Sequence, residues 1–218
     1  MVITYPYRTG LYVNLTNRCP CACEFCLRRN GPGVNGTDSL WLEREPTVEE
    51  VFADLDARNL NDFSELVFCG YGEPTERLDV LLAAARHAKT AKPDLKVRVN
   101  TNGLSDLIHG EPTAFRLQGL VDAVSISLNA SDPDRYLKIC RPKFGRGSWQ
   151  AMIDFAQSCK AYVPDVVMTI VDSPVTTPEE QAKCRAITDR IGVRLRIRAY
   201  ENPDSGTSST SLESPVSS

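Results

Sequence analysis

The sequence lacks the long apolar runs that are typical of membrane proteins. No stretch of about 18 consecutive apolar residues occurs, which excludes the usual pattern of a transmembrane helix. The start of the chain, from Met1 to Gly10, contains neither a basic leader nor the apolar core of a signal peptide. We therefore expect a cytoplasmic protein that contacts no membrane.

An excess of basic residues is also absent. The chain has 25 Lys and Arg residues against 28 Asp and Glu residues, for a net charge of −3, and both signs are spread along its length. Proteins that bind nucleic acid or anionic lipid typically concentrate positive charge on one face or segment. We expect no nucleic-acid partner, so the function has to be inferred from motifs.

The eight cysteines are not spaced as in a disulfide scaffold. Four of them are crowded at Cys19, Cys21, Cys23 and Cys26, and the others lie far apart in the sequence. In a reducing cytosol, such crowding favours a metal site over disulfides.

Length and composition allow one folded domain. The 218 residues are 42% apolar and 24% charged, which is enough to bury one substantial core. Residues 201–218 are polar, serine-rich and without hydrophobic periodicity. We predict one catalytic domain over residues 1–200 and a disordered tail over residues 201–218.

Short β-rich runs alternate with amphipathic helical patterns, which predicts parallel strands joined by right-handed crossovers. The clearest helix begins with a capping box from Thr47 to Glu50, and Thr177 opens a late helix similarly. Residues 76–91 and 148–161 carry the same apolar stripe, whereas the helix after the third run is only weakly indicated. No dinucleotide-binding glycine fingerprint follows the first run, so a barrel is favoured over a dinucleotide-binding sheet. The fold class is therefore α/β. The predicted strands are residues 11–16, 65–69, 95–100, 122–128, 165–171 and 193–199.

Three of the crowded cysteines follow the first predicted strand with the spacing C-x3-C-x2-C. Thiolates on a compact loop can ligate three irons of a cubic iron–sulfur cluster and leave the fourth iron open to a small molecule. Cys21 adds a fourth thiol, which leaves two other interpretations open. These are a non-enzymatic zinc protein and a fully ligated electron-transfer protein.

The loop resembles the signature CxxxCx(aromatic)C of the radical S-adenosylmethionine (SAM) superfamily, with Phe25 at the aromatic position. The resemblance implies a partial (β/α)6 TIM-like barrel and a [4Fe–4S] cluster held by Cys19, Cys23 and Cys26. It also implies an oxidoreductase that cleaves SAM reductively. The resulting 5′-deoxyadenosyl radical would abstract a hydrogen atom from the substrate.

Glycine and polar residues gather after the predicted strands, at the edge where β/α barrels hold their ligands. The second run is followed by Gly70, Gly72 and Glu73, which resembles the family's GGE-type segment and implies contact with the SAM ammonium group. The alternative is an ordinary turn. The third run ends in Asn100 and Asn102, which resembles the NTNG segment that faces the methionyl or ribose part of SAM.

Alternation along the fourth run places Ser127 and Asn129 on one face, where we expect the SAM ribose hydroxyls as partners, although neighbouring strands or water can also satisfy them. Alternation along the last run groups Arg194, Arg196 and Arg198. They either bind an acidic substrate group or the SAM carboxylate, or lie on a solvated outer face. Arg141 is another candidate for the SAM carboxylate, and the sequence leaves open the role of Cys140.

The segments before Cys19 and around Gly72 look most like the TatD-associated radical SAM proteins, whose substrate is undefined. The implied partners are SAM, a small electron donor such as flavodoxin or ferredoxin, and an unidentified substrate, either a metabolite or a protein or peptide. Because no second cluster domain or long C-terminal cap is evident, we expect a partner protein or a large substrate to close the barrel.

Overall fold

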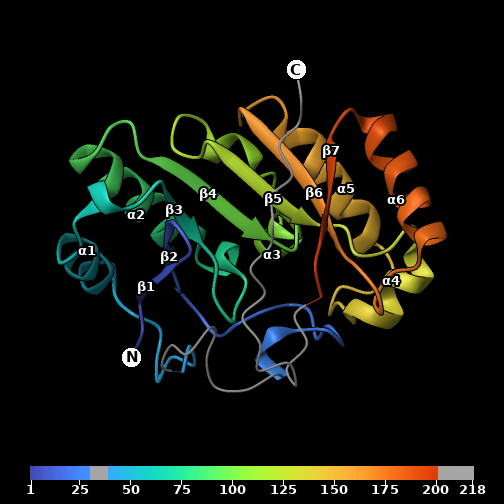
Figure 1. Cartoon of the computed structure of the whole chain (residues 1–218), viewed down its shortest axis with the longest axis horizontal. Helices are drawn as coiled ribbons and strands as arrows, with labels where there is room; N and C mark the ends of the chain where they lie inside the picture. The colour runs from blue at the N-terminus through green and yellow to red at the C-terminus, as the bar shows by residue number, and fades with distance from the viewer. Residues whose placement is uncertain (30–38, 201–218) are drawn as a thin grey trace.

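The computed structural model describes residues 1–29 and 39–200, which form one curved sheet with helices on its outer face (Figure 1). The seven strands are hydrogen-bonded in sequence order, from β1 to β7. All neighbouring pairs from β2 to β7 are parallel. The predicted α/β class and the partial barrel are confirmed.

The parallel strands overlap the six predicted runs. The first run ends as a strand at Val13. Beyond it, the backbone N–H of Asn14 bonds to the carbonyl oxygen of Ile3 at 2.8 Å, and the N–H of Cys69 bonds to the carbonyl oxygen of Val13 at 3.0 Å. The strands are β2 (Gly10–Val13), β3 (Glu65–Phe68), β4 (Lys96–Thr101), β5 (Ala123–Ser127), β6 (Asp165–Val171) and β7 (Arg194–Arg198).

The sequence prediction missed the edge strand β1 (Thr4–Tyr7), which pairs antiparallel with β2. The strand is short and contains Pro6, which cannot donate a hydrogen bond and is tolerated at a sheet edge. The hairpin turns at Arg8, whose φ of 54° is in the left-handed region.

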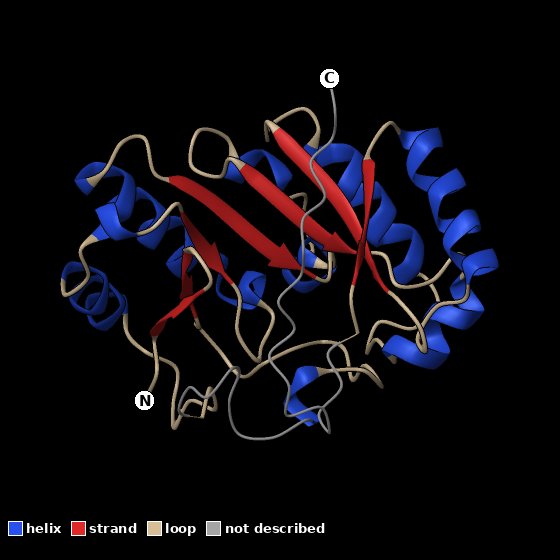
Figure 2. Cartoon of the chain, viewed as in Figure 1, coloured by secondary structure: helices blue, strands red, loops and turns tan. Residues whose placement is uncertain are grey.

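Four longer helices lie where the sequence predicts them, and Thr47 caps the first with the expected capping box. The weakly indicated helix is the short α3 (Ser105–His109), and α4 (Pro133–Cys140) was not predicted, although the Asp132 side chain caps it. Figure 2 shows the alternation of helices and strands. The longer helices are α1 (Val48–Asp56), α2 (Leu78–Ala91), α5 (Ser148–Cys159) and α6 (Pro178–Ile191), and the 3-10 turns are η1 (Leu27–Arg29), η2 (Leu60–Asp62), η3 (Pro74–Arg77) and η4 (Ala114–Leu117).

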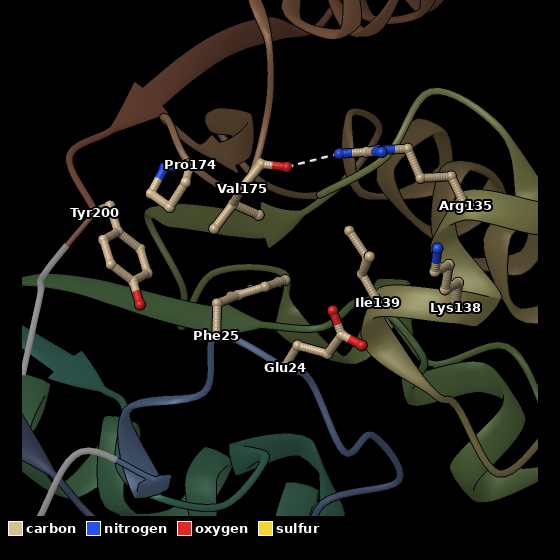
Figure 3. A pocket seen from close by; sticks show the side chains of 8 residues that line it. All are labelled: Glu24, Phe25, Arg135, Lys138, Ile139, Pro174, Val175 and Tyr200. Carbon is tan, nitrogen blue, oxygen red and sulfur yellow. Dashed lines mark hydrogen bonds between the residues drawn. The ribbon is translucent and has the colours of Figure 1, made fainter.

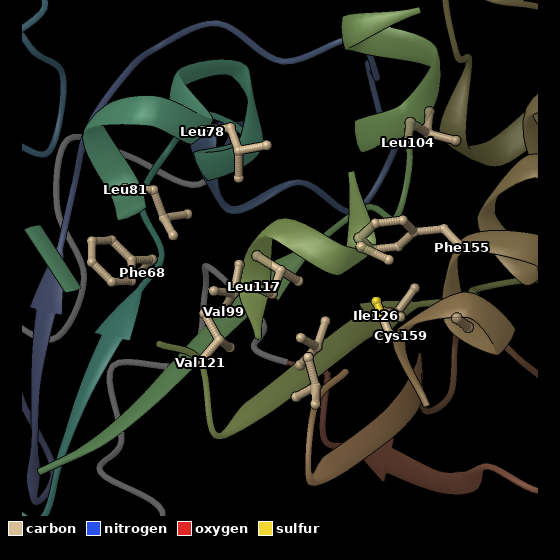
Figure 4. Close-up of a cluster of buried hydrophobic side chains, with 14 of the residues drawn as sticks. Phe68, Leu78, Leu81, Val99, Leu104, Leu117, Val121, Ile126, Phe155 and Cys159 are labelled. Carbon is tan, nitrogen blue, oxygen red and sulfur yellow. The ribbon is translucent and has the colours of Figure 1, made fainter. Parts of the chain in front are cut away.

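The hydrophobic core lies between the helices and the outer face of the sheet (Figure 4). Phe68, Val99 and Ile126 on the strands are buried against helix residues such as Leu81 and Phe155. Because side chains alternate along a strand, the residues between them face the concave side of the sheet. That side carries polar and charged groups, and it leads to the edge where the strands end.

The predicted tail, residues 201–218, lies outside the described residues. Within the described ranges, no helix is long and apolar enough to cross a membrane.

Replacing Thr47 with Ala removes the side-chain oxygen that accepts the N–H of Glu50 at the start of α1. We expect a loss of about 1 kcal/mol in the free energy of unfolding, measured in urea. The control is Thr90→Ala, because Thr90 is exposed inside α2 and bonds only to the carbonyl of Arg86. Equal stability of Thr47→Ala and the unmodified protein would contradict the capping role.

Candidate active site

The crowded cysteines lie in the loop that follows β2, at the edge where β4 and β5 also end (Figure 1). Cys19, Cys23 and Cys26 are half-buried, whereas Cys21 is buried. The three predicted ligands therefore share one loop and a similar exposure, and Cys21 differs from them in being buried.

The end of α4 holds this loop in place through three backbone hydrogen bonds. Ala22 N–H donates to the Cys140 carbonyl at 3.0 Å, Glu24 N–H donates to the Ile139 carbonyl at 2.9 Å, and Lys143 N–H donates to the Pro20 carbonyl at 2.8 Å. Arg141, a candidate for the SAM carboxylate, instead donates to Glu24 Oε1 at 2.6 Å. The helix that the sequence did not indicate thus supports the loop.

Arg28 lies against the backbone of the cysteine loop. Its Nη1 donates to the Asn17 carbonyl at 3.3 Å, and its Nη2 donates to the Cys21 carbonyl at 3.2 Å. Burial works against the charged guanidinium, but the nearby thiol of Cys26, followed by Cys19 and Cys23, raises the pKa of Arg28 above its ordinary value. A fixed cation therefore faces the three half-buried thiols.

The thiols of the loop differ in their tendency to ionise. Hydrogen bonds from Cys140 and then Cys21 lower the pKa of Cys23 to about 4, and a hydrogen bond from Cys21 lowers the pKa of Cys19. The same hydrogen bonds raise the pKa of Cys21 and of Cys140, which act as the donors. Thiolates are the form that ligates metal, so this donor set suits an iron–sulfur cluster at Cys19 and Cys23.

No three His, Cys, Asp or Glu side chains within residues 1–29 and 39–200 are arranged to hold one metal ion. The ligands of a cubic cluster bind separate irons and do not have to meet at one point.

The Glu73 carboxylate is buried and accepts four hydrogen bonds. Oε1 accepts from Thr75 N–H at 3.1 Å, Thr75 Oγ1 at 2.8 Å and Thr101 Oγ1 at 2.7 Å, and Oε2 accepts from Asn102 N–H at 2.7 Å. Burial raises the pKa of Glu73, and these donors oppose that rise. The carboxylate thus joins the ends of β3 and β4 and is occupied by donors of the chain itself. Contact between the SAM ammonium group and the backbone around Glu73 stays a prediction.

The two glycines before Glu73 lie against the chain that leads to the cysteine loop. A Cβ atom on Gly70 would lie 2.1 Å from Asn14 Oδ1, and one on Gly72 would lie 2.1 Å from the carbonyl oxygen of Thr16. Both positions therefore require glycine for close packing of the β2 and β3 loops.

The asparagines after β4 differ in their surroundings. Asn102 Nδ2 lies 3.9 Å from Cys19 Sγ, beside the thiol loop. Asn100 Oδ1 instead accepts from Arg98 Nη1 at 3.0 Å on the concave face of the sheet. Only Asn102 is in contact with a predicted ligand.

Asn129 has an unpaired acceptor at the end of β5. The residue is buried in the left-handed conformation, with φ of 59°, and its Oδ1 has no hydrogen-bond partner in the described chain. Its Nδ2 lies 3.6 Å from Cys140 Sγ, and Cys23 Sγ lies 3.8 Å from the Cys140 carbonyl. Ser127 is half-buried and pairs in register with Thr169 of β6.

A cavity of about 330 Å³ opens beside the loop (Figure 3). The ring of Phe25 lies among its lining side chains, and Arg135 closes one side through a hydrogen bond to the Val175 carbonyl at 2.6 Å. Of the lining residues, only Phe25 was predicted from the sequence. Apart from Glu24, the others lie in α4 or after β6, which are far from the loop in the sequence and come next to it only in the folded chain. The other lining residues are Glu24, Lys138, Ile139, Pro174 and Tyr200.

Replacing Glu73 with Gln puts an amide N–H₂ against groups that already donate, so buried donors lose their acceptor. We expect a loss of about 3 kcal/mol in the free energy of unfolding, measured by urea denaturation. The matched control is Glu111→Gln, because Glu111 is exposed; it should stay within about 0.5 kcal/mol of the unmodified protein. Similar stabilities for both variants would show that the carboxylate does not hold the strand ends together.

Comparisons with solved structures find the same fold. SuiB of Streptococcus suis matches 95% of this chain and 43% of its own, with a TM-score of 0.63 and 13% identity. A radical SAM methyltransferase from Sphaerobacter thermophilus matches 92% of this chain and 69% of its own, with a TM-score of 0.60 and 17% identity.

A curated relative, molybdenum cofactor biosynthesis protein 1 of Drosophila melanogaster, is 28% identical over 149 residues, or 67% of this chain. The match covers 24% of that relative, so the chain spans about a quarter of its length. The family model of the Radical SAM superfamily matches residues 13–184, from β2 to α6. The chain therefore belongs to the radical SAM superfamily of enzymes.

Proposed function

We propose that this chain holds a [4Fe–4S] cluster through Cys19, Cys23 and Cys26. We further propose that it cleaves SAM reductively to a 5′-deoxyadenosyl radical, which abstracts a hydrogen atom from a substrate. The observation that carries the proposal is the loop itself, in which three half-buried thiols lie next to the Arg28 guanidinium at the end of the parallel sheet. Membership of the superfamily supports the same reaction.

When bound, the cluster would supply one electron and an open iron for the amino and carboxylate groups of SAM. The chain's own part is to fix the three thiols and offset their charge. The bonds from α4 to the loop perform the first task, and Arg28 performs the second. A fixed set of charges needs no rearrangement when the electron moves.

We assign SAM to the cavity of Figure 3 and the strand ends beside it. Phe25 would pack on the nucleoside, and Asn129 Oδ1, which lacks a partner in the described chain, would accept a hydrogen bond from a ribose hydroxyl, with Ser127 next to it. The backbone at Gly70 to Glu73 would receive the ammonium group. Asn102 would contact the methionyl part, with Asn100 further from it on the concave face.

The finer identity is also a proposal. The segments before Cys19 and around Gly72 support a place among the TatD-associated radical SAM proteins. We propose that residues 1–200 form the catalytic domain and that a flavodoxin or ferredoxin supplies the electron. A partner protein or large substrate would close the open side of the barrel. The eight free cysteines fit a reducing compartment such as the cytoplasm.

Replacing Cys23 with Ala should abolish SAM cleavage, because the cluster loses one of its three protein ligands. The measurement is chromatographic detection of 5′-deoxyadenosine after anaerobic reconstitution with iron and sulfide and reduction by dithionite. Cys184→Ala is the control, because Cys184 is buried in α6 and lies outside the loop. SAM cleavage by Cys23→Ala at the control's rate would exclude Cys23 as a ligand.

The alternative function, a zinc or fully ligated electron-transfer protein, depends on Cys21 as a fourth ligand. The Cys21 thiol is buried and donates to Cys19 and Cys23, so we expect Cys21→Ala to keep a cluster of about four irons per chain. Iron and zinc analysis of the reconstituted variant measures this. Loss of all iron, or stoichiometric zinc in the unmodified protein that disappears in the variant, would favour the alternative.

A further inference from the structure

Arg196 of β7 lies across the concave face of the sheet. Its Nη2 donates to Ser125 Oγ of β5 at 2.9 Å. In the sheet, β6 lies between β5 and β7, so the side chain has to extend over β6, near Thr169, which pairs in register with Arg196. The guanidinium therefore faces the interior of the partial barrel and not its outer surface.

A second guanidinium on this face, that of Arg98, is fully used by neighbouring acceptors. Its Nε and Nη2 donate to the two carboxylate oxygens of Glu65 at 2.9 and 2.5 Å. Nη2 also lies 3.4 Å from the Tyr12 hydroxyl, and Nη1 donates to Asn100 Oδ1 at 3.0 Å. The charge of Arg98 is thus already paired with that of Glu65 in a bidentate contact.

Arg196 has no such partner. Within residues 1–29 and 39–200, it forms no ion pair with a carboxylate, whereas Arg194 on the same face of β7 pairs with Asp165 Oδ1 at 2.6 Å. Partial burial of the guanidinium, followed by the charges of Arg98 and Arg198, lowers the pKa of Arg196, although the residue as a whole is exposed. Neighbouring like charges are stabilised when an anion lies between or beside them.

The position is also open to a ligand. Arg196 and Arg198 are exposed, whereas Ser125, to which Arg196 donates, is buried. Ser125 precedes Ser127 on the same face of β5, so the Arg196 guanidinium, which donates to Ser125, reaches deeper into the barrel than the strand ends that we assign to SAM.

We propose that Arg196 binds an oxyanion of the substrate, either a phosphate or a carboxylate group. The inference rests on the proposed function, because it places the substrate beneath SAM in the same barrel. A planar guanidinium with free donors binds either oxyanion through paired hydrogen bonds. The substrate would enter with its anionic end toward β7 and its reacting carbon toward the thiol edge.

The test is isothermal titration calorimetry of the reconstituted full chain with tripolyphosphate and, separately, with citrate. The two probes distinguish phosphate from carboxylate recognition. We expect saturable binding of at least one probe, weakened about tenfold or more by Arg196→Gln and less by Arg196→Lys, which keeps the charge. Arg194→Gln is the matched control, because Arg194 is on the same strand and face but is already paired, and it should change affinity by less than about twofold.

Three outcomes would overturn the inference. They are no saturable binding of either probe, equal weakening by Arg194→Gln and Arg196→Gln, and competition between the probe and SAM for the site, which would assign Arg196 to the SAM carboxylate. SAM cleavage by the unmodified protein is measured separately. Cleavage without probe binding refutes only this inference, and probe binding that depends on Arg196 without cleavage refutes only the proposed function.

Discussion

The thiol edge of the sheet depends on one buried carboxylate. Glu73 accepts hydrogen bonds from Thr101 and Asn102 at the end of β4, and its own N–H donates to the Arg18 carbonyl at 2.8 Å, directly before the cysteine loop. A buried charge is costly unless it is hydrogen-bonded, and both carboxylate oxygens of Glu73 accept hydrogen bonds. The ends of β3 and β4 and the start of the loop are therefore fixed relative to one another, which gives the cysteines a rigid support.

The two faces of the sheet divide the work of the protein. The outer face packs against the helices and supplies the core, while the concave face carries Arg98, Ser125 and Arg196. At the edge between them, α4 holds the cysteine loop through backbone hydrogen bonds to Ala22 and Glu24. The arginine that we propose to bind an oxyanion therefore lies on the concave face, whereas the cavity beside Phe25 and the three half-buried thiols lie at the loop that follows β2.

The sequence predicts those parts that local pattern determines. Strand alternation located β2 to β7, and spacing alone singled out Cys19, Cys23 and Cys26. Strand β1 was not predictable from the sequence, because a short edge strand containing Pro6 has no clear pattern. Neither were the hydrogen bonds by which α4 supports the cysteine loop. The partners of Glu73 and the direction of Arg196 were not predictable either, since both depend on contacts between strands far apart in the sequence. The local sequence therefore indicates most of the secondary structure, but it does not indicate which partner each polar side chain binds.

The most direct test of the central claim is electron–nuclear double resonance of the reduced, reconstituted protein with SAM labelled with ¹⁵N at its amino group. The account predicts a hyperfine coupling between the label and the cluster, because three cysteine ligands leave one iron open to SAM. A paramagnetic cluster without coupling to the label, at saturating SAM, would mean that a fourth protein ligand closes the cluster, and it would contradict the account.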